Sequence, residues 1–118
     1  MSHHFLSVGT VLKNARDLVT KGWCQDAFEV EGRDRVTRYD VLGALDKASE
    51  GYRHHVYASA RFAVNEAILD GEFDGEPVRD DVIVDWNDAP GRTQEEVVAM
   101  FNRAIEYVIK AEKEGVPF

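Results

Sequence analysis

The sequence contains one cysteine and no long apolar run, and each scarcity excludes a class of protein. A single thiol, Cys24, cannot close an internal disulfide, so the chain is not a disulfide-stapled scaffold and we expect a reducing compartment. No apolar run approaches the roughly 20 residues of a membrane span. The start, Met1 to His4, lacks the basic and then apolar build of a signal peptide. We therefore expect a cytoplasmic protein with no membrane contact.

Excess positive charge is also missing. The formal net charge is −8, and residues 66–88 carry all of it, because nine carboxylates stand there against Arg79 alone. Such a surface repels phosphate backbones, so we expect no nucleic-acid partner. The acidic stretch is either a solvated loop or a surface that docks on a basic partner protein, and the sequence leaves both interpretations open.

The remaining composition is that of an ordinary globular domain: 118 residues, of which 44% are hydrophobic and 31% charged. A chain of this length can bury a core without disulfides or a metal. Apolar residues at helical spacing predict helices over about residues 8–21, 38–49, 53–70 and 93–113. The predicted fold class is therefore mainly α: a single compact domain, 1–118, of three to four helices, with a minor β-hairpin left open near residues 26–37.

The last predicted helix has the clearest boundaries. Thr93 and Glu96 have the spacing of a capping box at its start. Gly115, followed by Pro117, predicts a left-handed stop at its end. The apolar face of this helix must pack against a hydrophobic core. The sequence leaves open whether part of that face instead contacts a second copy of the chain.

Other local signals are briefer. Ser7 is a candidate cap for the first helix, Gly22 a candidate left-handed stop, and Thr37 a candidate entry to the second helix. Gly43 lies inside that second helix, which predicts that another backbone packs closely there. Residues 82–85 are too few to show a period, and we interpret them as extended.

Three short motifs occur in order: Gly-Trp-Cys-Gln at 22–25, Leu-Gly-Ala-Leu at 42–45 and Trp-Asn-Asp-Ala-Pro-Gly-Arg-Thr at 86–93. Together they resemble a family of small proteins from actinobacteria and their bacteriophages that is catalogued as a domain of unknown function. The similarity spans about residues 8–110. It implies a compact cytoplasmic domain, in the host cytoplasm if phage-encoded, with no assigned reaction, cofactor or partner.

Cys24 is the candidate nucleophile of the chain. To react it would need a histidine, His54 or His55, to lower its pKa, and Asn87 to orient that histidine. No signature of a cysteine enzyme surrounds it, and a lone intracellular cysteine is more often a small buried hydrophobe. We therefore expect a non-enzymatic protein without a cofactor, and keep a small cytoplasmic enzyme using Cys24 as an alternative.

An acidic loop offers a partial calcium pattern. Asp70, Glu72, Asp74 and Asp81 fall at positions 1, 3, 5 and 12 of a calcium loop. Asp81 is shorter than the usual bidentate glutamate, and Pro77 removes a backbone donor. We assign no metal, and keep a calcium-responsive binding module as a second alternative.

Aromatic, amide and guanidinium side chains suit a pocket for a polar ligand or a partner peptide. The candidate binding residues are Trp23, Gln25, Trp86, Asn87, Asp88 and Arg92. The competing interpretation is architectural, with these side chains packing and hydrogen-bonding in a turn before the last helix. We expect an accessory protein that binds a host protein through the acidic stretch or through the loop at Trp86.

Overall fold

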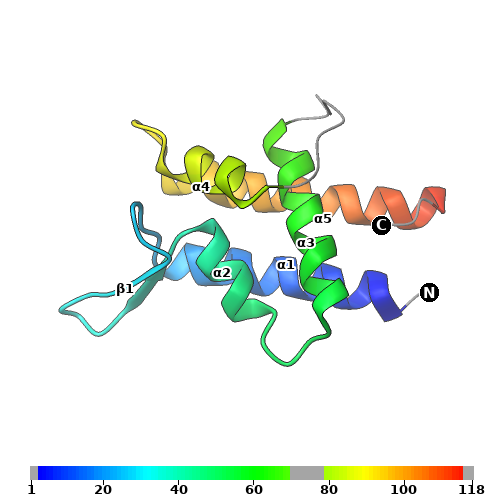
Figure 1. Cartoon of the computed structure of the whole chain (residues 1–118), viewed down its shortest axis with the longest axis horizontal. Coiled ribbons are helices and arrows are strands. Elements are labelled where there is room, and N and C mark those ends of the chain that lie inside the picture. Colours follow the sequence, from blue (N-terminus) through cyan, green and yellow to red (C-terminus); the bar gives the residue numbers. More distant parts are fainter. Residues whose placement is uncertain (1–2, 70–78, 116–118) are drawn as a thin grey trace.

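The computed structural model describes residues 3–69 and 79–115, which form five helices and one two-stranded sheet (Figure 1). In chain order the elements are α1 (His3–Lys21), β1 (Glu29–Glu31), β2 (Thr37–Tyr39), α2 (Val41–Ala48), α3 (His54–Leu69), α4 (Asp80–Asp88) and α5 (Gln94–Glu114). The predicted mainly α domain with a minor hairpin is confirmed, with one helix more than expected.

Helices α1 and α5 form the base of the fold. They lie side by side and run in opposite directions, so that the start of α1 and the end of α5 share one end of the molecule (Figure 1). α3 crosses both, and α2 packs on α1 beside it, with α4 against α2 and α3. All the other described helices therefore cover the same side of the α1–α5 pair.

The core fills the space between these layers. Apolar faces of α1, α2, α3 and α5 meet there, with Leu12, Leu45, Val64 and Phe101 fully buried. The apolar face predicted for the last helix is largely in this core, but Ile109 remains 48% exposed. Ile109 therefore marks the side of the α1–α5 pair that the other helices leave uncovered.

The predicted end of α1 at residue 21 is confirmed, whereas its predicted start and the left-handed stop at Gly22 are wrong. The helix begins at His3, so Ser7 lies within it and caps nothing. Gly22 is not among the glycines with positive φ. A Cβ at this position would lie 2.8 Å from the Arg38 side chain and 3.2 Å from the Thr37 carbonyl oxygen. Gly22 is therefore explained by the close approach of β2 rather than by a left-handed turn.

The start of α2 also differs from the prediction. Thr37 belongs to β2, and the N-cap is Asp40, whose carboxylate accepts the Gly43 N–H at 2.6 Å. The close backbone approach expected at Gly43 is confirmed, because a Cβ there would collide with the Phe28 carbonyl group. This glycine allows the segment before β1 to lie directly on α2.

Residues 82–85, interpreted as extended, are helical and form the middle of α4, so that prediction is wrong. The buried residues of this helix are Ile83 and Asn87, which are four positions apart on one face. Because Asn87 is polar, the spacing of apolar residues in this segment does not reveal the helical period. Asp80 and Asp81 in the first turn favour the helix through its dipole.

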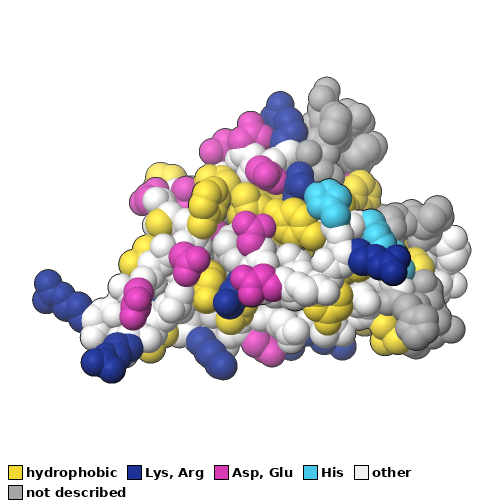
Figure 2. Space-filling view, turned by 60° about the horizontal axis from the view of Figure 1, so that its bottom comes forward, with side chains coloured by type: hydrophobic (Ala, Val, Ile, Leu, Met, Phe, Trp, Pro, Cys, Tyr) yellow, Lys and Arg dark blue, Asp and Glu magenta, His cyan; other side chains and the backbone are white. Residues whose placement is uncertain are grey.

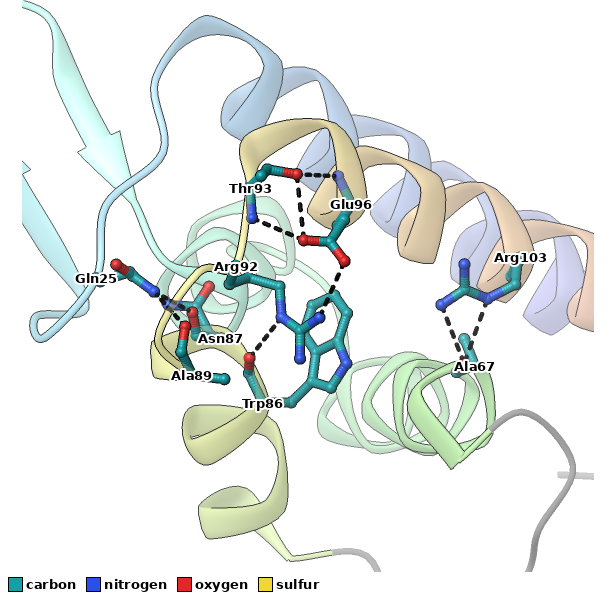
Figure 3. Close-up of polar contacts among 9 residues, drawn as sticks. All are labelled: Gln25, Ala67, Trp86, Asn87, Ala89, Arg92, Thr93, Glu96 and Arg103. Carbon is teal, nitrogen blue, oxygen red and sulfur yellow. Dashed lines mark hydrogen bonds and ion pairs between the residues drawn. The ribbon is translucent and has the colours of Figure 1, made fainter.

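Both ends of α5 agree with the prediction. Thr93 accepts the Glu96 N–H at 3.2 Å, and the Glu96 carboxylate accepts the Thr93 N–H at 3.0 Å (Figure 3). Gly115 ends the helix in the left-handed conformation at φ 68°. The first residue of the helix, Gln94, also donates to the Val19 carbonyl at 2.7 Å and thereby caps the end of α1.

Candidate functional site

The side chain of Asn87 connects three parts of the chain. Its Oδ1 accepts hydrogen bonds from Trp23 Nε1 at 2.8 Å and from the Val41 N–H at 3.1 Å. Its Nδ2 donates to the Cys24 carbonyl at 3.1 Å and to Asp88 Oδ1 at 2.9 Å. Asn87 has no exposed surface, and these bonds use both donors and both acceptor positions of its amide.

Gln25 and Asp26 fix the chain that follows α1 against the end of α4. Gln25 Nε2 donates to the carbonyl oxygens of Asn87 at 3.0 Å and Ala89 at 3.1 Å (Figure 3). The Asp26 N–H donates to Asp88 Oδ1 at 3.0 Å, and Asp26 adopts a left-handed conformation at φ 66°. The end of α4 leaves backbone carbonyls without a partner in the helix, and a segment about 60 residues earlier in the chain donates hydrogen bonds to them.

Arg92 is folded back onto Trp86. Its guanidinium carbon lies 3.9 Å from the centre of the indole ring, a cation–π contact, and its Nε donates to the Trp86 carbonyl at 2.8 Å (Figure 3). The same guanidinium is 3.3 Å from the Glu96 carboxylate. Arg92 therefore joins the end of α4 to the first turn of α5.

The structure brings the six candidate binding residues together into one group, which we call the Asn87 cluster: Trp23, Gln25, Trp86, Asn87, Asp88 and Arg92. Their polar atoms bond to one another and to nearby backbone. This arrangement favours the architectural interpretation, in which the cluster joins α4 to the segment that leads into the hairpin.

Cys24 lies beside this cluster as a thiol. Its Sγ is 3.4 Å from the Ala27 carbonyl and 3.7 Å from the Arg38 carbonyl. Burial, followed by the nearby carboxylates of Asp40 and Asp88, raises the pKa of the Cys24 thiol. Each of these effects opposes the thiolate that a nucleophile requires.

The structure does not bring the candidate histidines to Cys24. The His55 ring stacks on His4 near the start of α1, with ring centroids 5.1 Å apart. Cys24 follows the other end of that helix, and the 1.5 Å rise per residue separates the two ends by roughly 25 Å. His54, next to His55, starts α3 at the same distant end.

Of the calcium candidates, Asp70, Glu72 and Asp74 lie outside the described residues. Asp81 is in the first turn of α4, where its carboxylate is 3.4 Å from Arg79. Over residues 3–69 and 79–115, no group of three or more histidines, cysteines and carboxylates is placed to hold a metal ion.

Sequence reasoning missed an exposed apolar surface on the hairpin. β1 pairs antiparallel with β2, Val30 lies opposite Arg38, and the hydrogen bond from the Gly32 N–H to the Val36 carbonyl continues the pairing. Because side chains alternate along strands, Phe28, Val30 and Val36 share one face. These three residues are 58%, 42% and 38% exposed, and we call them the hairpin face.

The fold and the Asn87 cluster define a class of protein: a small, mainly helical domain with one β-hairpin, in which the segment before the hairpin is bonded to the end of the fourth helix. The chain belongs to a family of unknown function, DUF6197, and the match covers residues 6–107. A search of curated proteins and a search of solved structures each found no match. In the described part of the chain, no helix has the length and apolar content to cross a membrane.

Proposed function

We propose that this protein binds another protein, catalyses no reaction, and uses the hairpin face as its contact surface. The supporting observation is that three large, exposed apolar side chains, Phe28, Val30 and Val36, gather on one element. Single exposed apolar residues are common on proteins, whereas a group of them is typical of an interaction site. Figure 2 shows basic side chains projecting at the hairpin end of the molecule, with hydrophobic and acidic ones interspersed behind them.

The hairpin is held in place before any partner arrives. The Phe28 carbonyl accepts the Asp40 N–H at 3.1 Å, directly beside the cap of α2. On the other side, Gln25 bonds to the end of α4. A preformed surface loses less conformational entropy on binding than a segment that must first become ordered, and this favours a specific contact.

The exposed carboxylates of β1 do not belong to the hairpin face. Glu29 and Glu31 are exposed on either side of Val30. None of the ion pairs among the described residues includes either of them. By the alternation along the strands, both glutamates point away from the side of the sheet that carries Val30. Arg38, opposite Val30, lies on that side and pairs with Asp34 at 2.9 Å, so an apolar partner surface would complement the hairpin face.

The motif resemblance to actinobacterial and phage proteins extends the proposal to the setting. We propose an accessory protein of a phage or an actinobacterium, acting in the bacterial cytoplasm, which is the host cytoplasm for a phage gene. The partner is then a host protein.

Photo-crosslinking tests this proposal. A photoreactive amino acid replaces Phe28 in one variant and Tyr52 in a matched control, because Tyr52 is a 39% exposed aromatic residue outside the hairpin. After illumination in an actinobacterial lysate, we expect position 28 to label one protein, identified by mass spectrometry, that position 52 does not label. Equal labelling from both positions, or no specific product from position 28, would contradict the proposal.

A further inference from the structure

The side of the α1–α5 pair that faces away from α2, α3 and α4 carries an apolar groove. Its volume is about 210 Å³, and the residues along it are Phe5, Leu6, Gly9, Thr10, Lys13, Ile105, Val108, Ile109 and Glu112. Leu6 and Ile109 are 51% and 48% exposed, one on each wall. No other described element contributes to the groove, which lies at the opposite end of α1 from the hairpin.

Gly9 is the feature of this groove that the monomer does not explain. Glycine weakens the interior of a helix relative to alanine, so its presence calls for a reason. At Gly22, Gly32 and Gly43 the reason is an atom of the same chain in the space that a Cβ would need. At Gly9 nothing in the described chain lies within 4 Å of that position. The space is open to a second backbone.

We propose that a second copy of this chain occupies the groove, so that the α1–α5 pairs of two copies pack face to face about a two-fold axis at Gly9. This interface is separate from the hairpin face and does not depend on the proposed function. Shape alone would also allow a different protein to bind, and the charges at the two ends of the groove select the second copy.

Those charges are self-complementary. The hydrogen bond between Arg16 and Asn102 and the bond between Gln94 and Val19 set the register of the antiparallel pair, which places Lys13 toward one end of the groove. Glu112 lies toward the other end. Neither residue takes part in an ion pair of the described chain.

The direction of the two-fold axis follows from this arrangement. An axis across the helices exchanges the two ends of the groove, so each Lys13 meets the end of the other copy that carries Glu112, and Gly9 faces Gly9. An axis along the helices would gather both lysines at one end and both glutamates at the other, which like-charge repulsion disfavours. The dimer therefore pairs antiparallel α1 helices.

Sedimentation velocity of the full chain over a range of concentrations tests this inference. We expect the wild type to form a dimer and Gly9→Gln to remain monomeric, while the melting temperature of Gly9→Gln in its monomeric range is not lowered, since glutamine favours the helix and has free space there. A wild type that stays monomeric at every concentration would overturn the proposal, and so would a Gly9→Gln variant that dimerises like the wild type.

Charge reversal provides an independent arm of the test. Lys13→Glu should weaken dimerisation by about tenfold, and the double variant Lys13→Glu with Glu112→Lys should restore it, because the complementary pair is re-formed with its signs exchanged. The matched control is Lys110→Glu on the exposed surface of α5, outside the groove, which should dimerise like the wild type. A double variant as weak as the single one would exclude this interface.

Discussion

At the scale of single residues, the Asp40 carboxylate is subject to two opposing effects. It stabilises α2 by accepting the Gly43 N–H at 2.6 Å, yet only 2% of its surface is exposed. Burial dominates and raises the pKa of Asp40 to about 6, although its backbone hydrogen bonds act in the opposite direction. Near neutral pH the folded protein therefore holds a carboxylate that is largely shielded from water.

This predicts a pH dependence of stability. Because the folded-state pKa of about 6 exceeds the ordinary value of 3.8, the folded protein binds more protons than the unfolded chain. The contribution of Asp40 to the free energy of unfolding is fully present below about pH 4 and is lost as the pH rises through 6. Asp40→Asn keeps a capping oxygen without the charge, so near pH 8 it should be more stable than the wild type by up to about 3 kcal/mol.

Urea unfolding of wild type and Asp40→Asn between pH 4 and pH 8 measures this difference. The stability gap should open as the pH rises and close toward pH 4. A gap of the same size at every pH would show that the carboxyl group of Asp40 does not titrate abnormally in the fold.

The residues of the Asn87 cluster could be selected from the sequence, but their roles could not. Tryptophan, asparagine, glutamine and arginine near turn formers stand out by type, whether they line a pocket or join segments. The difference depends on where their polar atoms point. Gln25 bonds to the carbonyl of Asn87, 62 residues along the chain, and local sequence patterns carry no information about such a pairing.

At the scale of elements, the sequence predicts helices whose buried face is mainly apolar, including α3, where Ser59 and Asn65 are buried among apolar residues. α5 is such a helix, and its boundaries were predicted to within a residue because Thr93 and Gly115 mark them. α4 is not, since half of its buried face is the amide of Asn87. For the hairpin, the alternation of apolar residues is too brief to do more than leave the strands open, and contacts outside the hairpin decide which face remains exposed.

If Asn87 holds α4, α2 and the segment before the hairpin together, removing its amide should affect all three. Asn87→Ala leaves the Trp23 and Val41 N–H groups and the Cys24 carbonyl without this partner, and we expect a loss of about 3 kcal/mol in unfolding free energy.

The matched control is Asn102→Ala, because Asn102 accepts a bond from Arg16 at an exposed site. It should cost less than about 0.5 kcal/mol in the same urea titration. Similar losses in the two variants would contradict a joining role for Asn87.

At the scale of the whole molecule, part of the acidic charge of residues 66–88 is already used within the fold. Asp80 pairs with Arg61 at 2.9 Å, and Asp88 accepts the Asp26 N–H at 3.0 Å. Asp85 on α4 is exposed. The charge total therefore could not predict which carboxylates would be free for a partner, since folding pairs some of them with distant groups.

The two proposed surfaces occupy different places on this molecule. The hairpin face follows the end of α1, whereas the groove lies along its first half, between α1 and α5. A dimer formed through the groove would leave both hairpin faces accessible. Two copies of one binding surface on one particle would raise the apparent affinity for a partner that is itself repeated.

The role of the hairpin face is tested by purifying the crosslinked partner and measuring its dissociation constant for the wild type and for Val30→Lys. Val30 is 42% exposed, so lysine should be tolerated by the fold while placing a charge in the hairpin face. We expect Val30→Lys to weaken binding by about tenfold or more. Tyr52→Lys, outside the hairpin, should bind like the wild type. An unchanged dissociation constant for Val30→Lys would contradict the assignment of the hairpin face as the contact surface.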